Sequence, residues 1–404
     1  MLSKLVEQGK LTWDTPIKTA LPAFELADKD ITAKFLIKHA ACACTGMPRR
    51  DMEFVFGSKS DSIDDALNQL HSMKPTTGFG ETFQYSNHLV AVGGLAGANT
   101  YGKGTDLFSK YENAMNDLVF APLGMVATRV KPKATDKNLA SPHAHEFDGK
   151  MAPIPQKMDD MVYPVAPAGS IWSNVDDLSR YVMMELRKGK NEKGQSLFSE
   201  EQILKRRTPG VKVDDQTHYG LGLFIENNKG INIVQHGGNT MGFTSDMLFL
   251  PDHNVGMVVL TNASGVNGFR NALKQKLLEV LLGAKPMSAE MIQSSAKTYK
   301  DMVMKTRERV STKKTDTQWI SDYIGRFKNS DLGGIEIKKT SHGFEIANPR
   351  WTSKLGSAKE QTGEKLLSLT SAPWSGAVEL RVQREPKKLI LDDAQVKYEF
   401  VEEK

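Results

Sequence analysis

Four short apolar runs between residues 219 and 261 constrain this chain most, because only a few residues separate the first run from the second and the third from the fourth. The runs are Tyr219–Ile225, Ile231–Gln235, Thr244–Leu250 and Val255–Thr261. Turns this short join antiparallel neighbours, so the pattern predicts an antiparallel meander. Helical spacing follows at once from Phe269 to Leu282 and predicts a helix that covers one face of the sheet.

Helical patterns precede this meander and alternating patterns follow it. Upstream, helical spacing recurs in the ranges 61–74, 88–98, 106–120 and 174–189, with an irregular stretch over 126–168. Downstream, residues 318–404 alternate apolar and polar residues between turn residues, which predicts a small all-β module. We therefore expect an α/β (α+β) fold in three parts: a main domain over 1–283, a basic linker helix over 284–314 and a β-rich accessory domain over 315–404.

The composition argues against several classes of protein. Charged residues make up 25% and hydrophobic residues 39% of the chain, and no apolar run reaches about 18 residues, so we expect no membrane span. The net charge is only +5. The basic stretch Lys297–Lys314 could attract nucleic acid, but no aromatic platform accompanies it. A solvated linker helix is the preferred interpretation, with no nucleic-acid partner.

The histidines and cysteines give little reason to expect a metal. Cys42 and Cys44 follow His39 closely, but a zinc site would need a fourth ligand and a wider spacer, so we interpret them as ordinary buried thiols. His143 and His145 lack a third ligand nearby. We expect neither a metal nor a cofactor.

The tripeptide Tyr85-Ser86-Asn87, just before a predicted helix, carries groups that a hydrolase can use. The phenol could move a proton if nearby cations depress its pKa, and the Asn amide could bind a substrate carbonyl. Taken alone, the tripeptide is weak evidence, because a tyrosine at a helix start more often serves packing.

A second candidate is His236-Gly237-Gly238, which we expect at the end of a strand. Two glycines there would let a ligand lie against backbone N–H groups, and the N–H of Asn239 is the natural donor to an oxyanion. His236 could supply a hydrogen bond or a positive charge. The alternative, a β-bulge or loose turn, is equally compatible with these residues alone.

The chain contains only two Ser-x-x-Lys pairs, Ser294–Lys297 and Ser311–Lys314, and both fall in the basic linker. An exposed linker offers no buried setting that would lower the pKa of a lysine, so neither is a convincing nucleophile pair. No Gly-x-Ser-x-Gly elbow and no phosphate-binding loop is present.

Several segments in the same order resemble the β-lactamase-related serine hydrolases, a family that includes class C β-lactamases, D-aminopeptidases, D,D-peptidases and esterases. The matching segments are LVEQGKLTWDTPIKTALPAFEL, TGMP, FGETFQYSN, FAPLGM, PAGSIWSNVDDLSRY, YGLGLFI and HGGNTMGFTSDMLFLPDHNVGMVVLTN. The resemblance implies a β-lactamase/transpeptidase-like antiparallel sheet flanked by helices, plus a helical region. It also implies a serine hydrolase that acts on an amide or ester through an acyl-enzyme.

The resemblance also implies roles for individual residues. Tyr85 would be a general base or proton relay, and Asn87 its substrate-orienting partner. On the strand, His236, Gly237 and Gly238 would replace a Lys-Thr-Gly motif, with Gly237 and Thr240 contacting a small-molecule or peptide substrate. Asn239 would supply the oxyanion N–H. A histidine at the lysine position is closer to the peptidase and esterase branch than to true β-lactamases.

One departure from the family pattern lies at the front of the chain. In the family, Ser-x-x-Lys begins the helix whose end resembles LVEQGKL, which places the serine about two to three helical turns before Met1. The sequence therefore predicts a chain that is truncated at its N-terminus and inactive alone. The alternative is an inactive protein that binds a peptide or ester. A secretory signal would also precede Met1, so the compartment stays open, as does the oligomeric state.

Overall fold

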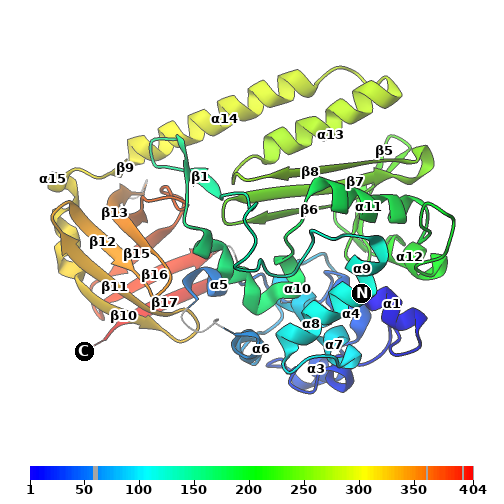
Figure 1. The fold of residues 1–404 in the computed structure, drawn as a ribbon. Helices are drawn as coiled ribbons and strands as arrows, with labels where there is room; N and C mark the ends of the chain where they lie inside the picture. Colours follow the sequence, from blue (N-terminus) through cyan, green and yellow to red (C-terminus); the bar gives the residue numbers. More distant parts are fainter. Residues whose placement is uncertain (58–61, 361–362, 394, 404) are drawn as a thin grey trace.

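The computed structural model describes residues 1–404 except 58–61, 361–362, 394 and 404. A helical region, an antiparallel sheet with helices on both faces, and a C-terminal barrel make up the fold (Figure 1). The strands of the sheet, in spatial and chain order, are β3 (Val211–Lys212), β4 (Thr217–Tyr219), β5 (Phe224–Asn228), β6 (Ile231–Thr240), β7 (Phe243–Leu250) and β8 (Val255–Thr261). The predicted meander is confirmed.

Alternation along the strands assigns the two faces of this sheet. Val234 and Phe249 pack with Val182 of α11 (Val175–Leu186) on one face. Ile233 packs with Leu278 of α13 (Asn267–Leu282) on the other. Figure 1 shows α13 and the long α14 (Ser288–Arg309) above the sheet, with the helical region below it. The predicted covering helix is therefore α13, and α11 covers the opposite face.

Two of the predicted strands have different limits in the structure. The run predicted over 219–225 is broken, because the chain turns through residues 220–223 between β4 and β5. Gly222 has a φ of +81°, and a Cβ at Gly220 would lie 2.4 Å from the carbonyl oxygen of Arg206. The next strand is longer than predicted, since β6 continues past Gln235 to Thr240.

Helix α7 (Asn87–Tyr101) is the central helix of the helical region and is built largely from small residues. A Cβ at Gly94 would lie 2.2 Å from Cβ of Pro167, and one at Gly93 would lie 2.8 Å from Cβ of Ala40. These glycines let neighbouring segments approach closely. The surrounding helices are α1 (Leu2–Glu7), α2 (Ile17–Ala20), α3 (Lys29–Lys34), α4 (Ile37–Ala41), α6 (Ile63–Leu70), α8 (Leu107–Met115), α9 (Ala121–Leu123) and α12 (Glu200–Arg206).

The stretch 126–168, expected to be irregular, contains short ordered elements. They are the hairpin of β1 (His143–His145) and β2 (Met151–Pro153), the 3-10 helix η2 (Gln156–Val165) and most of α10 (Ala166–Gly169). These elements are too short to give a clear periodicity in the sequence, so the sequence did not predict them. The sequence offers Asp61 or Ser62 as the N-cap of the helix predicted over 61–74; in α6, Oγ of Ser62 accepts from the N–H of Asp65, and Asp61 lies outside the described residues.

The C-terminal segment forms a closed antiparallel barrel. Its strands are β10 (Gly325–Asn329), β11 (Gly333–Thr340), β12 (Gly343–Ala347), β13 (Thr352–Lys359), β14 (Lys365–Leu369), β15 (Glu379–Gln383), β16 (Lys388–Asp393) and β17 (Val396–Glu402). Pairing of β10 with β17 and of β12 with β13 closes the barrel. The linker helix α14 runs into β9 (Val310–Ser311), which pairs with β13. The predicted all-β module is confirmed.

The barrel shares a hydrophobic core with α5 (Met52–Phe56) of the helical region. The Phe56 ring lies 5.2 Å from the Trp351 ring and 5.6 Å from the Phe400 ring, measured between centroids. Nε1 of Trp351 donates a hydrogen bond to the carbonyl oxygen of Val55 at 2.7 Å. The barrel is thus packed directly against the loop and helix that follow Thr45–Pro48.

Within the described part of the chain, no helix has the length and apolar character needed to cross a bilayer.

Candidate active site

The Tyr85–Asn87 segment enters the site from the start of α7. Ser86 is the N-cap residue, Asn87 is the first residue of the helix, and Tyr85 is half-buried just ahead of it. The N–H of Gln84 donates to the carbonyl oxygen of Ala43 at 2.7 Å. The segment that carries Tyr85 is therefore fixed to the chain around residue 43.

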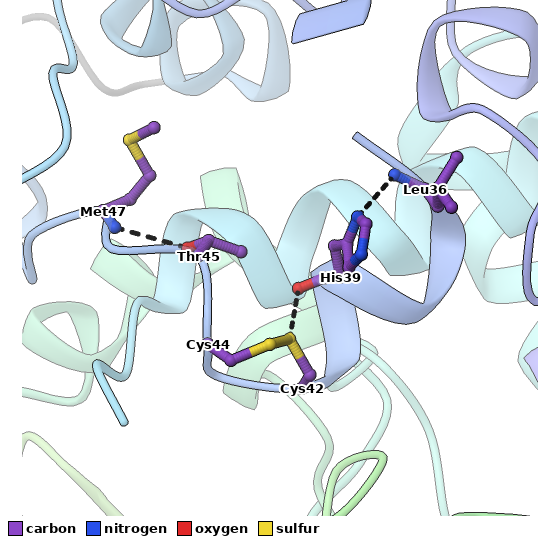
Figure 2. The surroundings of a disulfide bond; sticks show 6 residues. All are labelled: Leu36, His39, Cys42, Cys44, Thr45 and Met47. Carbon is purple, nitrogen blue, oxygen red and sulfur yellow. Dashed lines mark hydrogen bonds between the residues drawn. A yellow bond between two sulfur atoms is a disulfide. The ribbon is translucent and has the colours of Figure 1, made fainter. Parts of the chain in front are cut away.

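The segment around residue 43 contains a disulfide between Cys42 and Cys44, so the expectation of free thiols was wrong (Figure 2). Ala43, between them, has a φ of +49°, and this turn brings the two Cα atoms to 5.2 Å. Figure 2 shows Sγ of Cys42 beside the carbonyl oxygen of His39, at 3.3 Å. The N–H of Gly222 donates to the carbonyl oxygen of Ala41 at 2.9 Å. The disulfide loop thus contacts the segment before Tyr85 and the turn after Tyr219.

Strand β6 has an edge without a strand partner where the candidate motif lies. It pairs with β5 only from Ile231 to Gln235, and with β7 from Val234 to Thr240. Residues 236–240 therefore have a strand neighbour on one side only, among the residues that the structure describes. Backbone groups on such an edge can pair with an extended ligand. The bulge alternative is not needed, because residues 236–240 pair with β7 in regular register.

The two glycines of the motif make room for different neighbours. A Cβ at Gly237 would lie 2.2 Å from Nη1 of Arg270, whose side chain pairs with Asp246 at 3.6 Å on the α13 face. A Cβ at Gly238 would lie 2.8 Å from Oγ of Ser245. Gly237 is thus required by packing beneath the strand, while Gly238 keeps the face that carries His236 unobstructed.

Three aromatic rings from distant segments meet at this face. The Tyr85 ring lies 6.1 Å from the Tyr219 ring and 6.1 Å from the His236 ring, between centroids. The hydroxyl of Tyr219 lies 3.0 Å from Nε2 of His236, and Tyr219 is close enough to Tyr85 to lower the pKa of the Tyr85 phenol in part. The structure therefore brings together Tyr85 and His236, as the sequence predicts, and adds Tyr219. No motif in the sequence marks Tyr219 as more than a strand residue.

The hydrogen bonds of His236 fix its tautomer. Nδ1 lies 2.9 Å from the carbonyl oxygen of Gly237, which can only accept, so Nδ1 carries the proton. Nε2 then accepts from the hydroxyl of Tyr219. Burial lowers the pKa of His236, as does Arg270, and the Gly237 carbonyl offsets part of this effect. The arrangement favours a hydrogen-bonding role for His236 over a positive charge.

Burial also controls the pKa of Tyr85. Burial raises the pKa of this phenol, and the guanidinium of Arg49 offsets only part of that shift. A role for Tyr85 in proton transfer was expected only if nearby cations depressed the pKa of its phenol. The structure shows the opposite direction, because removal of the phenolate from water outweighs one partly exposed cation.

Asn87 is oriented by a carboxylate. Its Nδ2 donates to Oδ1 of Asp51 at 3.0 Å, and Oδ2 of Asp51 accepts from Nε of Arg49 at 2.5 Å. The guanidinium of Arg49 lies 6.0 Å from the centre of the Tyr85 ring. With one amide hydrogen held by Asp51, the Oδ1 atom of Asn87 is left to accept from another group.

The last two predicted residues differ in where their side chains lie. Oδ1 of Asn239 accepts from Oγ1 of Thr244 at 3.1 Å on the α13 face, so only its backbone can serve a ligand on the His236 face. The side chain of Thr240 and the backbone N–H of Met241 lie close enough to the buried Asp159 carboxylate to oppose part of the effect of burial on its pKa. Burial raises the pKa of Asp159 to about 6.

The two Ser-x-x-Lys pairs of this chain lie on other elements. Ser294 and Lys297 are on α14, across α13 and the sheet from the helical region (Figure 1). Ser311 is in β9, and Lys314 begins α15 (Lys314–Thr317). Among the described residues, no group of three or more His, Cys, Asp and Glu side chains could hold a metal ion.

Comparison with known proteins finds relatives that each match about two thirds of this chain. Unguisins hydrolase ungD' of Aspergillus campestris is 26% identical over 285 residues, which cover 65% of this chain and 50% of that protein. Protein flp of Staphylococcus aureus (strain N315) is 24% identical over 265 residues, which cover 64% of this chain and 49% of that protein. The chain thus spans about half the length of the curated relatives it matches.

Solved structures share the fold. An octameric penicillin-binding protein homologue from Pyrococcus abyssi aligns with a TM-score of 0.61 and 20% identity, over 99% of this chain and 85% of that one. A D-stereospecific amidohydrolase from Streptomyces aligns with a TM-score of 0.54 and 18% identity, over 65% of this chain and 78% of that one. The family model described as Beta-lactamase matches residues 1–282. The chain therefore belongs to the β-lactamase family.

Proposed function

We propose that the protein is a serine hydrolase of the penicillin-recognising type that acts on an amide or ester through an acyl-enzyme. One observation carries the proposal: the rings of Tyr85, Tyr219 and His236 meet on the face of β6 where residues 236–240 pair with β7 only, and the hydroxyl of Tyr219 lies 3.0 Å from Nε2 of His236. A reacting carbonyl held along that segment would lie near a phenol and an imidazole. The hydrolase name of a relative supports this reaction class.

In this proposal the substrate binds as an additional strand. Backbone groups of residues 236–240 hold the extended ligand, and the N–H of Asn239 donates to the developing oxyanion. The absence of a side chain at Gly238 keeps the ligand close to the strand. Asn87, oriented by Asp51, binds a carbonyl or amide of the substrate from the α7 side.

The three rings provide a route for the proton that a serine loses on attack. As Tyr85 accepts the serine proton, it passes its own proton to Tyr219, and Tyr219 passes its proton to Nε2 of His236. The product is an imidazolium whose Nδ1–H still donates to the Gly237 carbonyl. The reverse sequence returns the proton to the leaving group. Such a relay explains how a phenol of raised pKa could serve without resting as a phenolate.

Neither Ser-x-x-Lys pair of this chain is the nucleophile in this proposal, because neither lies on an element that holds Tyr85 or His236. An acylating fluorophosphonate probe, followed by mass spectrometric mapping, tests the assignment. We expect no adduct on the 404-residue chain, and an adduct on a Ser-x-x-Lys serine in a longer protein translated from a reading frame that contains it.

Two outcomes would contradict the assignment. An adduct on Ser294 or Ser311 would move the chemistry to another part of the molecule. A longer protein that binds peptide or ester ligands without forming any adduct would be a binding protein instead of an enzyme.

A further inference from the structure

Arg49 is held at two points although its side chain is 56% exposed. Its backbone N–H donates to Oε1 of Gln395 at 2.8 Å, and its Nε donates to Asp51 at 2.5 Å. Both oxygens of Asp51 are engaged, one by Arg49 and one by Asn87. The two Nη groups of Arg49 make no hydrogen bond to any residue that the structure describes. A guanidinium anchored on one edge therefore presents its other donors beside Tyr85.

The anchor Gln395 belongs to the barrel, where it lies between β16 and β17. The same Oε1 atom that receives the Arg49 N–H also receives Nε2 of Gln84 at 3.1 Å. Gln84 directly precedes Tyr85. One barrel side chain thus holds two loops of the helical region, one carrying Arg49 and one leading to Tyr85.

Arg49 also differs from Arg270 and His236, two other basic groups near the site. Its closest counterpart near the motif, Arg270, lies on the α13 face and pairs there with Asp246. Burial disfavours a positive charge on His236. A planar guanidinium with free donors matches the geometry of a carboxylate.

We propose that Arg49 determines specificity by binding a carboxylate of a peptide substrate, and that the barrel residue Gln395 positions it. This inference rests on the proposed function, since it assumes that the ligand lies between Tyr85 and residues 236–240. The barrel is then a part of substrate recognition as well as an accessory domain.

The test measures binding and needs no turnover. The 404-residue chain is titrated by NMR with N-acetyl-dialanine as the free acid and as the C-terminal carboxamide, each in the D,D and L,L forms. We expect the free acid to bind about tenfold or more tightly than the carboxamide, the range for hydrogen bonds to charged groups. The preference should shrink as salt is added, because ions screen a partly exposed cation.

Three variants divide the contributions. Arg49→Gln should make the two probes bind equally. Gln395→Ala should reduce the ratio of the free-acid affinity to the carboxamide affinity. A general loss of structure would weaken the binding of both probes alike and leave this ratio unchanged. Arg326→Gln is the matched control, since Arg326 is 70% exposed and also contacts a carboxylate, that of Glu336 at 3.6 Å. Its ratio should equal that of the unmodified chain.

The possible failures are distinguishable. Equal binding of acid and carboxamide, or a preference that survives Arg49→Gln, overturns the role of Arg49 and leaves the proposed function intact. An unchanged ratio in Gln395→Ala overturns the role of the barrel. If neither probe binds at all, both the inference and the ligand site of the proposed function are contradicted.

Discussion

The hydroxyl of Tyr219 lies 3.0 Å from Nε2 of His236, and the ring of Tyr219 lies 6.1 Å from the ring of Tyr85, measured between centroids. This one group connects the start of α7 with β6, two elements that are far apart in the sequence. Because Nδ1 of His236 donates to Gly237, Tyr219 must be the donor to Nε2. The state of all three rings therefore depends on a residue that the sequence motifs do not identify.

Replacement of Tyr219 by phenylalanine tests this dependence. The variant removes the donor that favours neutral His236, so the pKa of His236 should rise towards its ordinary value, measured by NMR titration of the imidazole. In a longer protein that forms an adduct with the fluorophosphonate probe, the same substitution should slow hydrolysis by about 10²-fold, the lower end of the range for acid–base groups. Tyr111→Phe, at another buried tyrosine, should change neither quantity.

Asp159 should make the free energy of unfolding depend on pH. Its pKa is raised from 3.8 in the unfolded chain to about 6 in the folded protein. The folded state therefore binds the extra proton between these values, and the associated stability is present below pH 4 and lost as pH rises through 6. Asp159→Asn should remove this loss, which is at most about 3 kcal/mol.

Urea unfolding of the unmodified chain and of Asp159→Asn between pH 4 and 7 measures this effect. The difference between the two should grow with pH and level off above 6. Asp160→Asn, at the exposed neighbour, should show a much smaller change. A constant difference between Asp159→Asn and the unmodified chain at all pH values would contradict the assignment.

The Cys42–Cys44 disulfide should stabilise two segments of the site, the one that leads to Tyr85 and the turn that follows Tyr219. Reduction by a dithiol should lower stability by about 1–2 kcal/mol, because the bond closes only a very short loop. Hydrogen exchange should accelerate at the amides of Gln84 and Gly222, which donate to the carbonyls of Ala43 and Ala41. The double variant Cys42→Ser, Cys44→Ser should exchange fast with or without reductant.

Arg50 should be essential to the junction between the helical region and the barrel. It pairs with the fully buried Glu53 and with Asp331 of the barrel at 3.0 Å. Arg50→Met would leave Glu53 without its cation and should cost on the order of 3–5 kcal/mol in urea unfolding. The exposed replacement Arg326→Met should cost less than about 1 kcal/mol. Equal losses would mean that Arg50 is not a buried junction residue.

The fold was largely predictable where short turns and strict alternation coincide. The meander from β5 to β8, the helix α13 and the barrel strands all combine a clear period with turn residues, so local signals agree with the tertiary structure. The limits of β4 and β5 were not predictable, because the apolar run is broken where Gly220 packs closely against Arg206 and Gly222 adopts a φ of +81°. Packing between distant segments leaves no local signal.

The candidate site was predictable only in its motif residues. Tyr85 and His236 stand in recognisable segments, and the structure places them together. Tyr219, Asp51 and Gln395 do not stand out, since their roles come from contacts with residues far away in the chain. The direction of the Tyr85 pKa shift was likewise hidden, because it depends on burial by the tertiary fold. The C-x-C disulfide depends on the φ of +49° at Ala43.

The position of a bound ligand tests the central claim most directly. A crystal structure of the chain with a non-hydrolysable peptide phosphonate should show the ligand extended along residues 236–240 of β6, with its phosphonyl oxygen near the N–H of Asn239 and its reactive centre facing Tyr85. A ligand bound on any other surface, with that edge of β6 left empty, would contradict the account.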